Sequence, residues 1–120
     1  MKKYKVYIVA LVTSVFGSEA FAENTYTNGF ENHIEEILAF SSEDNLVPQW
    51  AGMTQLTFTS NINWVGGEGC SIGGVAIRNQ DKHLISIAIQ AYAMKKPLKL
   101  YADSTQKVGS NCILRALATR

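Results

Sequence analysis

Strict alternation of apolar and polar residues predicts a half-buried strand at residues 55–60 (QLTFTS). Its leucine and phenylalanine fall on one side and its threonines on the other, a composition typical of strands. Residues 70–78 (CSIGGVAIR) form the next apolar run, and the glycine-rich turn at 66–69 makes the two runs a predicted hairpin. Gly73 and Gly74 inside the second run indicate a bulge or the close approach of a neighbouring backbone.

The clearest helix covers about residues 81–96, where apolar residues recur every three or four positions. An asparagine and an aspartate just before it are suited to cap its first turn. Lys95 and Lys96 fall in its last turn, where positive charge suits the helix dipole, and Pro97 ends it. The apolar stripe is unusually wide, so we expect the helix to pack on a sheet and also to contact a neighbour.

Two further strands are predicted after the helix, at residues 98–102 (LKLYA) and 111–119 (NCILRALAT), with a polar turn at 103–110. Both faces of the final strand are largely apolar, so we expect it to lie centrally in the sheet or at an interface. Residues 34–40 (IEEILAF) stay ambiguous, because their apolar positions fit a helical face and fit strand alternation poorly. Residues 23–29 (ENTYTNG) are polar and turn-rich, which is typical of a loose N-terminal arm.

The first 22 residues have the pattern of a secretory signal peptide cleaved after Ala22. Lys2, Lys3 and Lys5 form a basic segment, residues 6–16 (VYIVALVTSVF) are apolar, and an Ala-Phe-Ala sequence supplies the small residues of a cleavage site. A retained membrane anchor is the alternative, but it would need an apolar run of ~20 residues. We therefore expect residues 23–120 to form one domain that works in the periplasm or outside the cell, with no membrane span.

The charge of the exported chain is close to zero. Three of the 11 basic and one of the 10 acidic residues lie in the leader, which leaves eight basic and nine acidic side chains. A near-neutral domain has no electrostatic footprint for nucleic acid or for an anionic membrane. Nucleic acid is therefore not an expected partner.

Cys70 and Cys112 are expected to form an intramolecular disulfide, because an exported protein meets oxidising conditions. A metal site is the weaker alternative. The two cysteines and the widely spaced His33 and His83 lack the clustered ligand spacing of metal sites. No metal and no cofactor are expected.

The titratable residues give no catalytic set. His33 has no serine or cysteine nucleophile in a recognisable motif around it, and His83 lies in the first turn of the predicted helix. Both are expected on the surface. Glu35 and Glu36 are adjacent, so in a strand they would point to opposite faces and could not act together on one substrate. The sequence therefore predicts a protein that is not an enzyme.

Two tryptophans in polar surroundings are candidate ligand contacts. Trp64 follows Asn61 and Asn63, and Trp50 follows a Pro-Gln pair. An indole ring beside side-chain amides offers a flat apolar platform with hydrogen-bonding groups, which suits sugars. Packing in the core is the alternative for both rings.

Four segments carry a family resemblance: CSIGGVAIRN at 70–79, DKHLISIAIQAYAMKK at 81–96, PLKLYAD at 97–103 and NCILRALATR at 111–120. In this order of a cysteine-bearing strand, a helix, a Pro-led strand and a final strand, the chain resembles the B subunits of AB5 toxins. The similarity is to the pertussis, subtilase-cytotoxin and typhoid-toxin group. The layout is also similar to that of small exported bacterial proteins of unknown function.

The resemblance implies an oligonucleotide/oligosaccharide-binding (OB) barrel of five antiparallel strands and one helix, and a homo-oligomer that is a ring-shaped pentamer. It further implies binding of a cell-surface glycan and delivery of a catalytic A subunit. The segment 30–34 does not match the glycan pocket of that family, and Cys112 is the only cysteine after the helix, so no pocket residue is carried over. The alternative is a monomeric or dimeric periplasmic protein with a structural or unknown binding role.

Overall fold

The structure, a computed structural model, describes residues 24–120, and the predicted signal peptide lies outside this part of the chain. The described chain has an α+β fold, as predicted. Its elements are β1 (Asn24–Tyr26), β2 (Ile34–Ala39), the 3₁₀ turn η1 (Pro48–Trp50), β3 (Thr54–Phe58), β4 (Gly74–Ile77), α1 (Lys82–Ala93), β5 (Leu98–Val108) and β6 (Asn111–Thr119).

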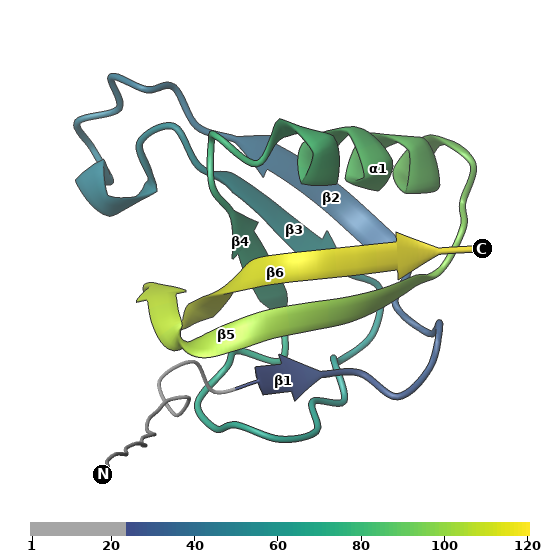
Figure 1. Cartoon of the computed structure of the whole chain (residues 1–120). Helices are drawn as coiled ribbons and strands as arrows, with labels where there is room; N and C mark the ends of the chain where they lie inside the picture. Colours follow the sequence, from purple (N-terminus) through teal and green to yellow (C-terminus); the bar gives the residue numbers. More distant parts are fainter. Residues whose placement is uncertain (1–23) are drawn as a thin grey trace, which may run out of the picture.

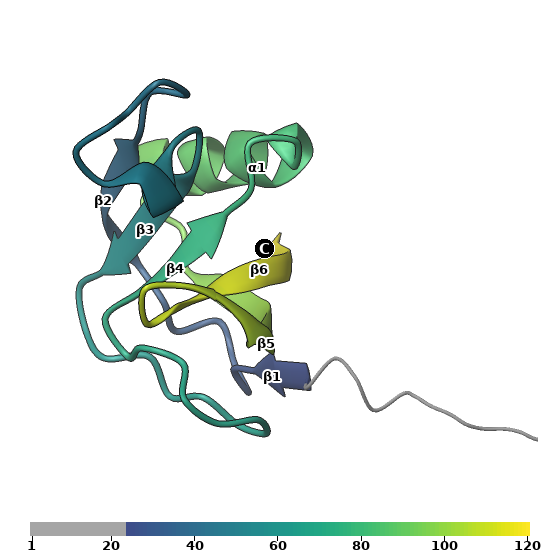
Figure 2. The same ribbon diagram turned by 90° about the vertical axis from the view of Figure 1, so that its left-hand side faces the viewer.

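The six strands form one mixed sheet in the order β1-β5-β6-β4-β3-β2. Neighbouring strands are antiparallel except β4 and β6, which are parallel and are paired in register at Ala76 and Ile113. The sheet is strongly bent, with β2, β3 and β4 on one side, β6, β5 and β1 on the other, and α1 above the space between them (Figures 1 and 2). The edge strands β1 and β2 do not pair, so the sheet is not closed into a barrel, and the predicted OB fold of five antiparallel strands is not confirmed.

The predicted hairpin of the second and third apolar runs is confirmed as β3 and β4, which pair from Thr54 and Ile77 to Thr57 and Gly74. Gly74 is required by a close approach. A Cβ atom there would lie 2.8 Å from the Leu56 carbonyl oxygen and 2.8 Å from Asn111 Oδ1. Real Cβ contacts are longer than this, so only glycine lets β4 lie this close to the β3 backbone and the Asn111 side chain without a shift.

The helix α1 covers the main hydrophobic core. It buries Leu84, Ala88 and Ala91, whose exposed fractions are 5% or less. They pack with apolar side chains from five strands, including Leu56, Val75, Leu98, Leu100 and Leu114. The helix ends at Ala93 rather than at residue 96, and Asp81 precedes it without a side-chain capping bond, so the predicted cap is wrong.

A second, smaller cluster contains Trp50, Ala76, Val108 and Ile113, with Phe40 packed against it. The rings of Phe40 and Trp50 stack with centroids 5.2 Å apart. This cluster fixes the loop between β2 and β3 onto the sheet. The central place of β6, predicted from its two apolar faces, is confirmed.

The N-terminal arm is ordered, contrary to the prediction. Residues 24–26 form β1 and pair with β5 from Asn24 and Asp103 to Tyr26 and Tyr101. Thr25 is 1% exposed, and its hydroxyl donates a hydrogen bond to the Gly66 carbonyl. The polar composition of this segment predicted a loose arm. A polar side chain can nevertheless be buried in a strand when a tertiary hydrogen bond satisfies it, as one does for the Thr25 hydroxyl.

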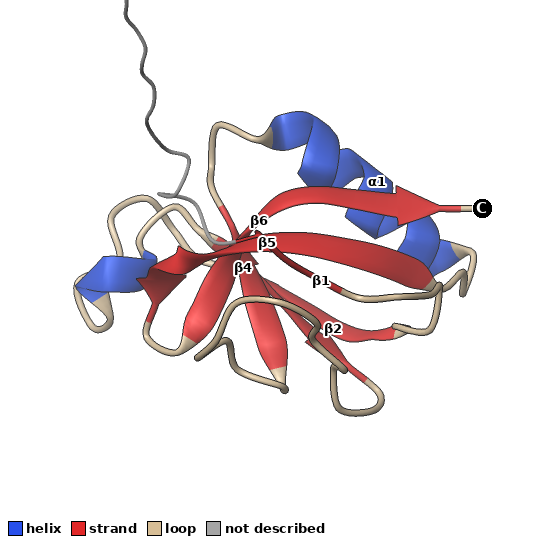
Figure 3. Ribbon diagram, turned by 60° about the horizontal axis from the view of Figure 1, so that its bottom comes forward, coloured by secondary structure: helices blue, strands red, loops and turns tan. Residues whose placement is uncertain are grey.

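Two other segments are more extended than the apolar pattern indicates. The ambiguous residues 34–39 form an edge strand, and a register shift between Ile34 and Glu36 explains the poor alternation. The predicted turn at 103–110 is wrong, because β5 continues to Val108 and the chain reverses at Gly109. Asp103 is buried and accepts hydrogen bonds from the Thr105 backbone and hydroxyl, which satisfies polar groups inside the strand. The long β5–β6 ribbon crosses the shorter strands (Figure 3).

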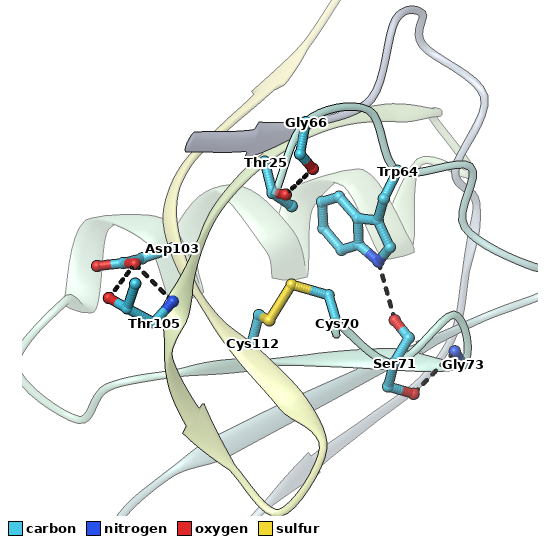
Figure 4. Close-up of a disulfide and its surroundings, with 9 residues drawn as sticks. All are labelled: Thr25, Trp64, Gly66, Cys70, Ser71, Gly73, Asp103, Thr105 and Cys112. Atoms are coloured by element: carbon cyan, nitrogen blue, oxygen red, sulfur yellow. Dashed lines mark hydrogen bonds between the residues drawn. A yellow bond between two sulfur atoms is a disulfide. The ribbon is translucent and has the colours of Figure 1, made fainter. Parts of the chain in front are cut away.

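The predicted disulfide between Cys70 and Cys112 is confirmed, with Cα atoms 5.2 Å apart (Figure 4). It joins the β3–β4 connection to the start of β6, and Cys112 is fully buried. A disulfide fits a protein that works in an oxidising compartment. In the described part of the chain, no helix is long and apolar enough to cross a membrane.

Candidate functional site

A cleft of about 560 Å³ lies between the C-terminal end of α1 and the ends of two strands. Three segments line it. His33 and Ile34 come from the start of β2, Thr59 follows β3, and residues 91–96 provide the helix wall, with Tyr92, Lys95 and Lys96 as its polar side chains. We call it the α1–β2 cleft.

The two walls of the cleft are fastened to each other. The Thr59 N–H donates to the His33 carbonyl at 2.9 Å, which holds the strand wall together. Asn32, one residue before His33, pairs with Leu98, which follows the helix wall. Its side-chain amide also donates to the Leu98 carbonyl at 3.0 Å. The spacing of the walls is therefore set by buried hydrogen bonds and not by loose loops.

The helix ends in a tight reversal that places two lysines at the cleft. The Lys96 N–H donates to the Ala91 carbonyl at 2.8 Å, and the Lys95 N–H donates to the Tyr92 carbonyl at 3.3 Å. This pair of bonds is the Schellman arrangement of helix ends, in which one residue takes a left-handed conformation. Here that residue is Lys95, with φ of 56°.

The floor of the cleft is apolar and its rim is polar. Ile34 is 7% exposed and Ala91 is 1% exposed, so both belong to the floor. The Tyr92 ring is 47% exposed and offers a flat face with a hydroxyl. Thr59 adds a second hydroxyl at the rim. An apolar floor with a few polar groups is the usual construction of a small-ligand site.

The described lining of the cleft has cationic or neutral side chains and no carboxylate. Within residues 24–120, neither Lys95 nor Lys96 makes a side-chain hydrogen bond or an ion pair. Each ammonium group has three donors and no acceptor, so the unpaired lysines leave several donors for a ligand. Glu31 and Glu35 flank His33 in the chain, but neither lines the cleft.

The tryptophans predicted as ligand contacts lie in two different hydrophobic clusters. Trp50 is 7% exposed and stacks on Phe40. Trp64 packs against the main core, and its indole N–H donates to the Ser71 carbonyl at 2.9 Å, beside the disulfide (Figure 4). Both rings therefore have internal packing roles in this structure.

Asn61 and Asn63 are exposed in the loop after β3, next to Trp64. Neither of them lines the α1–β2 cleft. They remain predicted contacts for a ligand on the loop surface. The structure thus separates this predicted site from the cleft.

The cleft itself was not anticipated from the sequence. The sequence predicts that His33 is exposed, and the structure confirms this. For Thr59, Tyr92 and the two lysines, the sequence predicts only the strand or helix that contains them, and no role in a cleft. The sole local signal is the Lys-Lys-Pro sequence at the helix end. No group of three His, Cys, Asp or Glu side chains among residues 24–120 is placed to hold a metal ion.

No protein-family model, curated protein or solved structure matches this chain. The resemblance to AB5 toxin B subunits therefore stays a prediction.

Proposed function

We propose that this chain is an exported, non-catalytic binding protein that holds a sugar ring of a cell-surface glycan in the α1–β2 cleft. One observation carries the proposal: a cleft of about 560 Å³ combines an apolar floor with the exposed Tyr92 ring and several hydrogen-bonding side chains. Its volume lies within the ~300–1,000 Å³ range of small-ligand sites. Sugars present both apolar ring faces and hydroxyl groups, which an aromatic ring and polar side chains recognise together.

The lining favours binding over catalysis. His33 and Thr59 line the cleft, but no carboxylate is among the described lining residues to orient the histidine or to act as an acid. Hydrolysis of glycosidic bonds usually needs a pair of carboxyl groups. Acyl transfer usually needs a nucleophile, a base and a group that orients the base. Neither set can be assembled from the described lining of the cleft.

Self-association is the second part of the proposal. Ile89 on α1 and Met94, the C-cap residue that follows the helix, are 51% and 61% exposed. Exposed apolar side chains on one element favour a contact with another molecule. We propose a homo-oligomer formed by this helix, a ring in the form that the resemblance implies. A catalytic partner subunit enters the proposal through that resemblance alone.

The binding proposal is tested by NMR titration of isotope-labelled residues 23–120 with galactose and lactose, followed by a glycan array. We expect the largest amide shifts at Thr59 and residues 91–96. Shifts confined to Asn61, Asn63 and Trp64 would move the site to the loop surface. The absence of shifts with every sugar on the array would overturn glycan binding.

Light scattering tests the oligomer. Five times the mass of one chain would support a ring, and Ile89→Glu should then release monomers. Ser86→Glu, at an exposed polar position of the same helix, is the matched control. A monomer or dimer in the unmodified protein would favour the alternative, a periplasmic protein that binds its ligand without a ring.

A further inference from the structure

Lys95 occupies a backbone conformation that is otherwise found only at glycines among the residues that the structure describes. Within residues 24–120 it is the only non-glycine residue with positive φ, at 56°, while five glycines share that region. The Cβ atom of an L-residue crowds the backbone there, so the last position of a Schellman helix end usually favours glycine. Strained positions of this kind cluster at functional sites, which makes the Lys95 side chain a candidate functional group.

The Lys95 side chain lines the α1–β2 cleft together with Lys96 and His33. The cleft has no carboxylate in its described lining, and the part of the chain that the structure describes offers neither lysine an ion-pair partner. Convergent donors of one charge in a partly enclosed site raise the local concentration of ligands of the opposite charge. Hydrogen bonds between an ammonium group and an oxyanion are also stronger than those between neutral groups.

We propose that the cleft selects ligands that carry an oxyanion, and that Lys95 is the residue that determines this selectivity. The oxyanion is a carboxylate, phosphate or sulfate, and the remainder of the ligand lies against Tyr92 above the apolar floor. This inference rests on the proposed binding function and adds the ligand's charge and the residue that recognises it. Lys96 contributes charge from a half-buried position in the same wall.

A matched ligand series on residues 23–120 tests the proposal. Galactose, galacturonic acid and galactose 6-phosphate share one ring and differ in charge, and inorganic phosphate provides the anion without the ring. We expect both acidic sugars to shift the amides of Thr59 and residues 91–96 at concentrations about tenfold lower than galactose does. Phosphate alone should shift the same residues more weakly than galactose 6-phosphate.

Four variants separate charge from backbone strain. Lys95→Gln keeps the strained backbone and removes the charge, so it should abolish the preference for acidic sugars, whereas Lys95→Arg should keep it. Lys95→Gly should abolish the preference without lowering the melting temperature, because glycine relieves the left-handed conformation. Lys82→Gln is the control, since Lys82 lies at the opposite end of the same helix and bonds the Asn79 carbonyl.

The outcomes distinguish the inference from the function on which it rests. Equal binding of galactose and the acidic sugars, or an unchanged preference in Lys95→Gln, would overturn the inference and leave sugar binding intact. Phosphate binding that needs Lys95, without binding of any sugar, would support the oxyanion site and overturn the glycan proposal. If none of the four ligands shifts any amide, both the oxyanion inference and the glycan proposal are overturned.

Discussion

Asn32 and Leu98 are joined by three hydrogen bonds. The backbone N–H of each residue donates to the carbonyl of the other, at 3.2 and 2.9 Å, and Asn32 Nδ2 donates to the same Leu98 carbonyl at 3.0 Å. Asn32 is 5% exposed and Leu98 is fully buried. Because these residues lie next to the two walls of the α1–β2 cleft, the bridge between them sets the width of the site.

Asn32→Ala should lower the free energy of unfolding by about 1–2 kcal/mol. The substitution removes the donor that serves the Leu98 carbonyl and, at 3.4 Å, the Thr27 hydroxyl. Urea unfolding of the oxidised protein measures the loss. Asn28→Ala is the control at an exposed position in the same segment and should change stability by less than about 0.5 kcal/mol. Equal effects of the two substitutions would show that the buried amide contributes nothing specific.

Gly74→Ala should destabilise the fold by about 1–3 kcal/mol, because the new methyl group overlaps the Leu56 carbonyl and the Asn111 side chain. Gly73→Ala is a matched neighbour. Its Cβ would meet only Ser71 Oγ, at 3.7 Å, so this substitution should be nearly neutral or slightly stabilising. Thermal unfolding of both variants checks the contrast. A tolerated alanine at 74 would contradict the close approach of β3, β4 and β6.

Replacing both Cys70 and Cys112 with serine should remove about 4 kcal/mol of stability, the chain-entropy value for a bridge that spans 42 residues. For a domain of this size, the melting temperature should fall by more than about 10 °C. Calorimetry in oxidising buffer measures the shift. The control is a reductant, which should lower the melting temperature of the unmodified protein and leave that of the variant unchanged.

Trp64→Phe should lower stability by about 1 kcal/mol, because phenylalanine cannot donate to the Ser71 carbonyl. It should leave sugar binding in the α1–β2 cleft unchanged, since Trp64 does not line the cleft. Chemical unfolding and the galactose titration are measured on the same sample. A loss of sugar binding without a loss of stability would instead support the platform predicted from the sequence.

The regular elements were predictable where local pattern and burial agree. The final strand at 111–119 was predicted with its observed bounds, and the helix was predicted to run to residue 96, about one turn beyond its observed end at Ala93. The disulfide was predictable because an exported protein meets oxidising conditions and the sequence contains two cysteines, which can pair with each other. In these cases one face of an element is buried, so the spacing of apolar residues reports the structure directly.

Tertiary hydrogen bonds decided the parts that the pattern missed. Thr25 and Asp103 are polar and almost fully buried, and both lie in strands that looked like an arm or a turn. The cleft was hidden for a different reason, because His33, Thr59 and Lys95 come from three separate segments. The left-handed conformation of Lys95 has no sequence signature, since a lysine near a helix end equally suits an ordinary last turn.

The pairing of β1 with β5 imposes a delay on folding. Residues 24–26 are the first described part of the chain to be synthesised. Apart from an isolated bridge between Tyr26 and Val65, they pair with β5 at residues 98–108, near the opposite end. Until almost the whole polypeptide has emerged, this segment lacks its partner strand in the sheet. We therefore expect β1 to join the sheet late in folding, when it pairs with β5 and covers the outer edge of that strand.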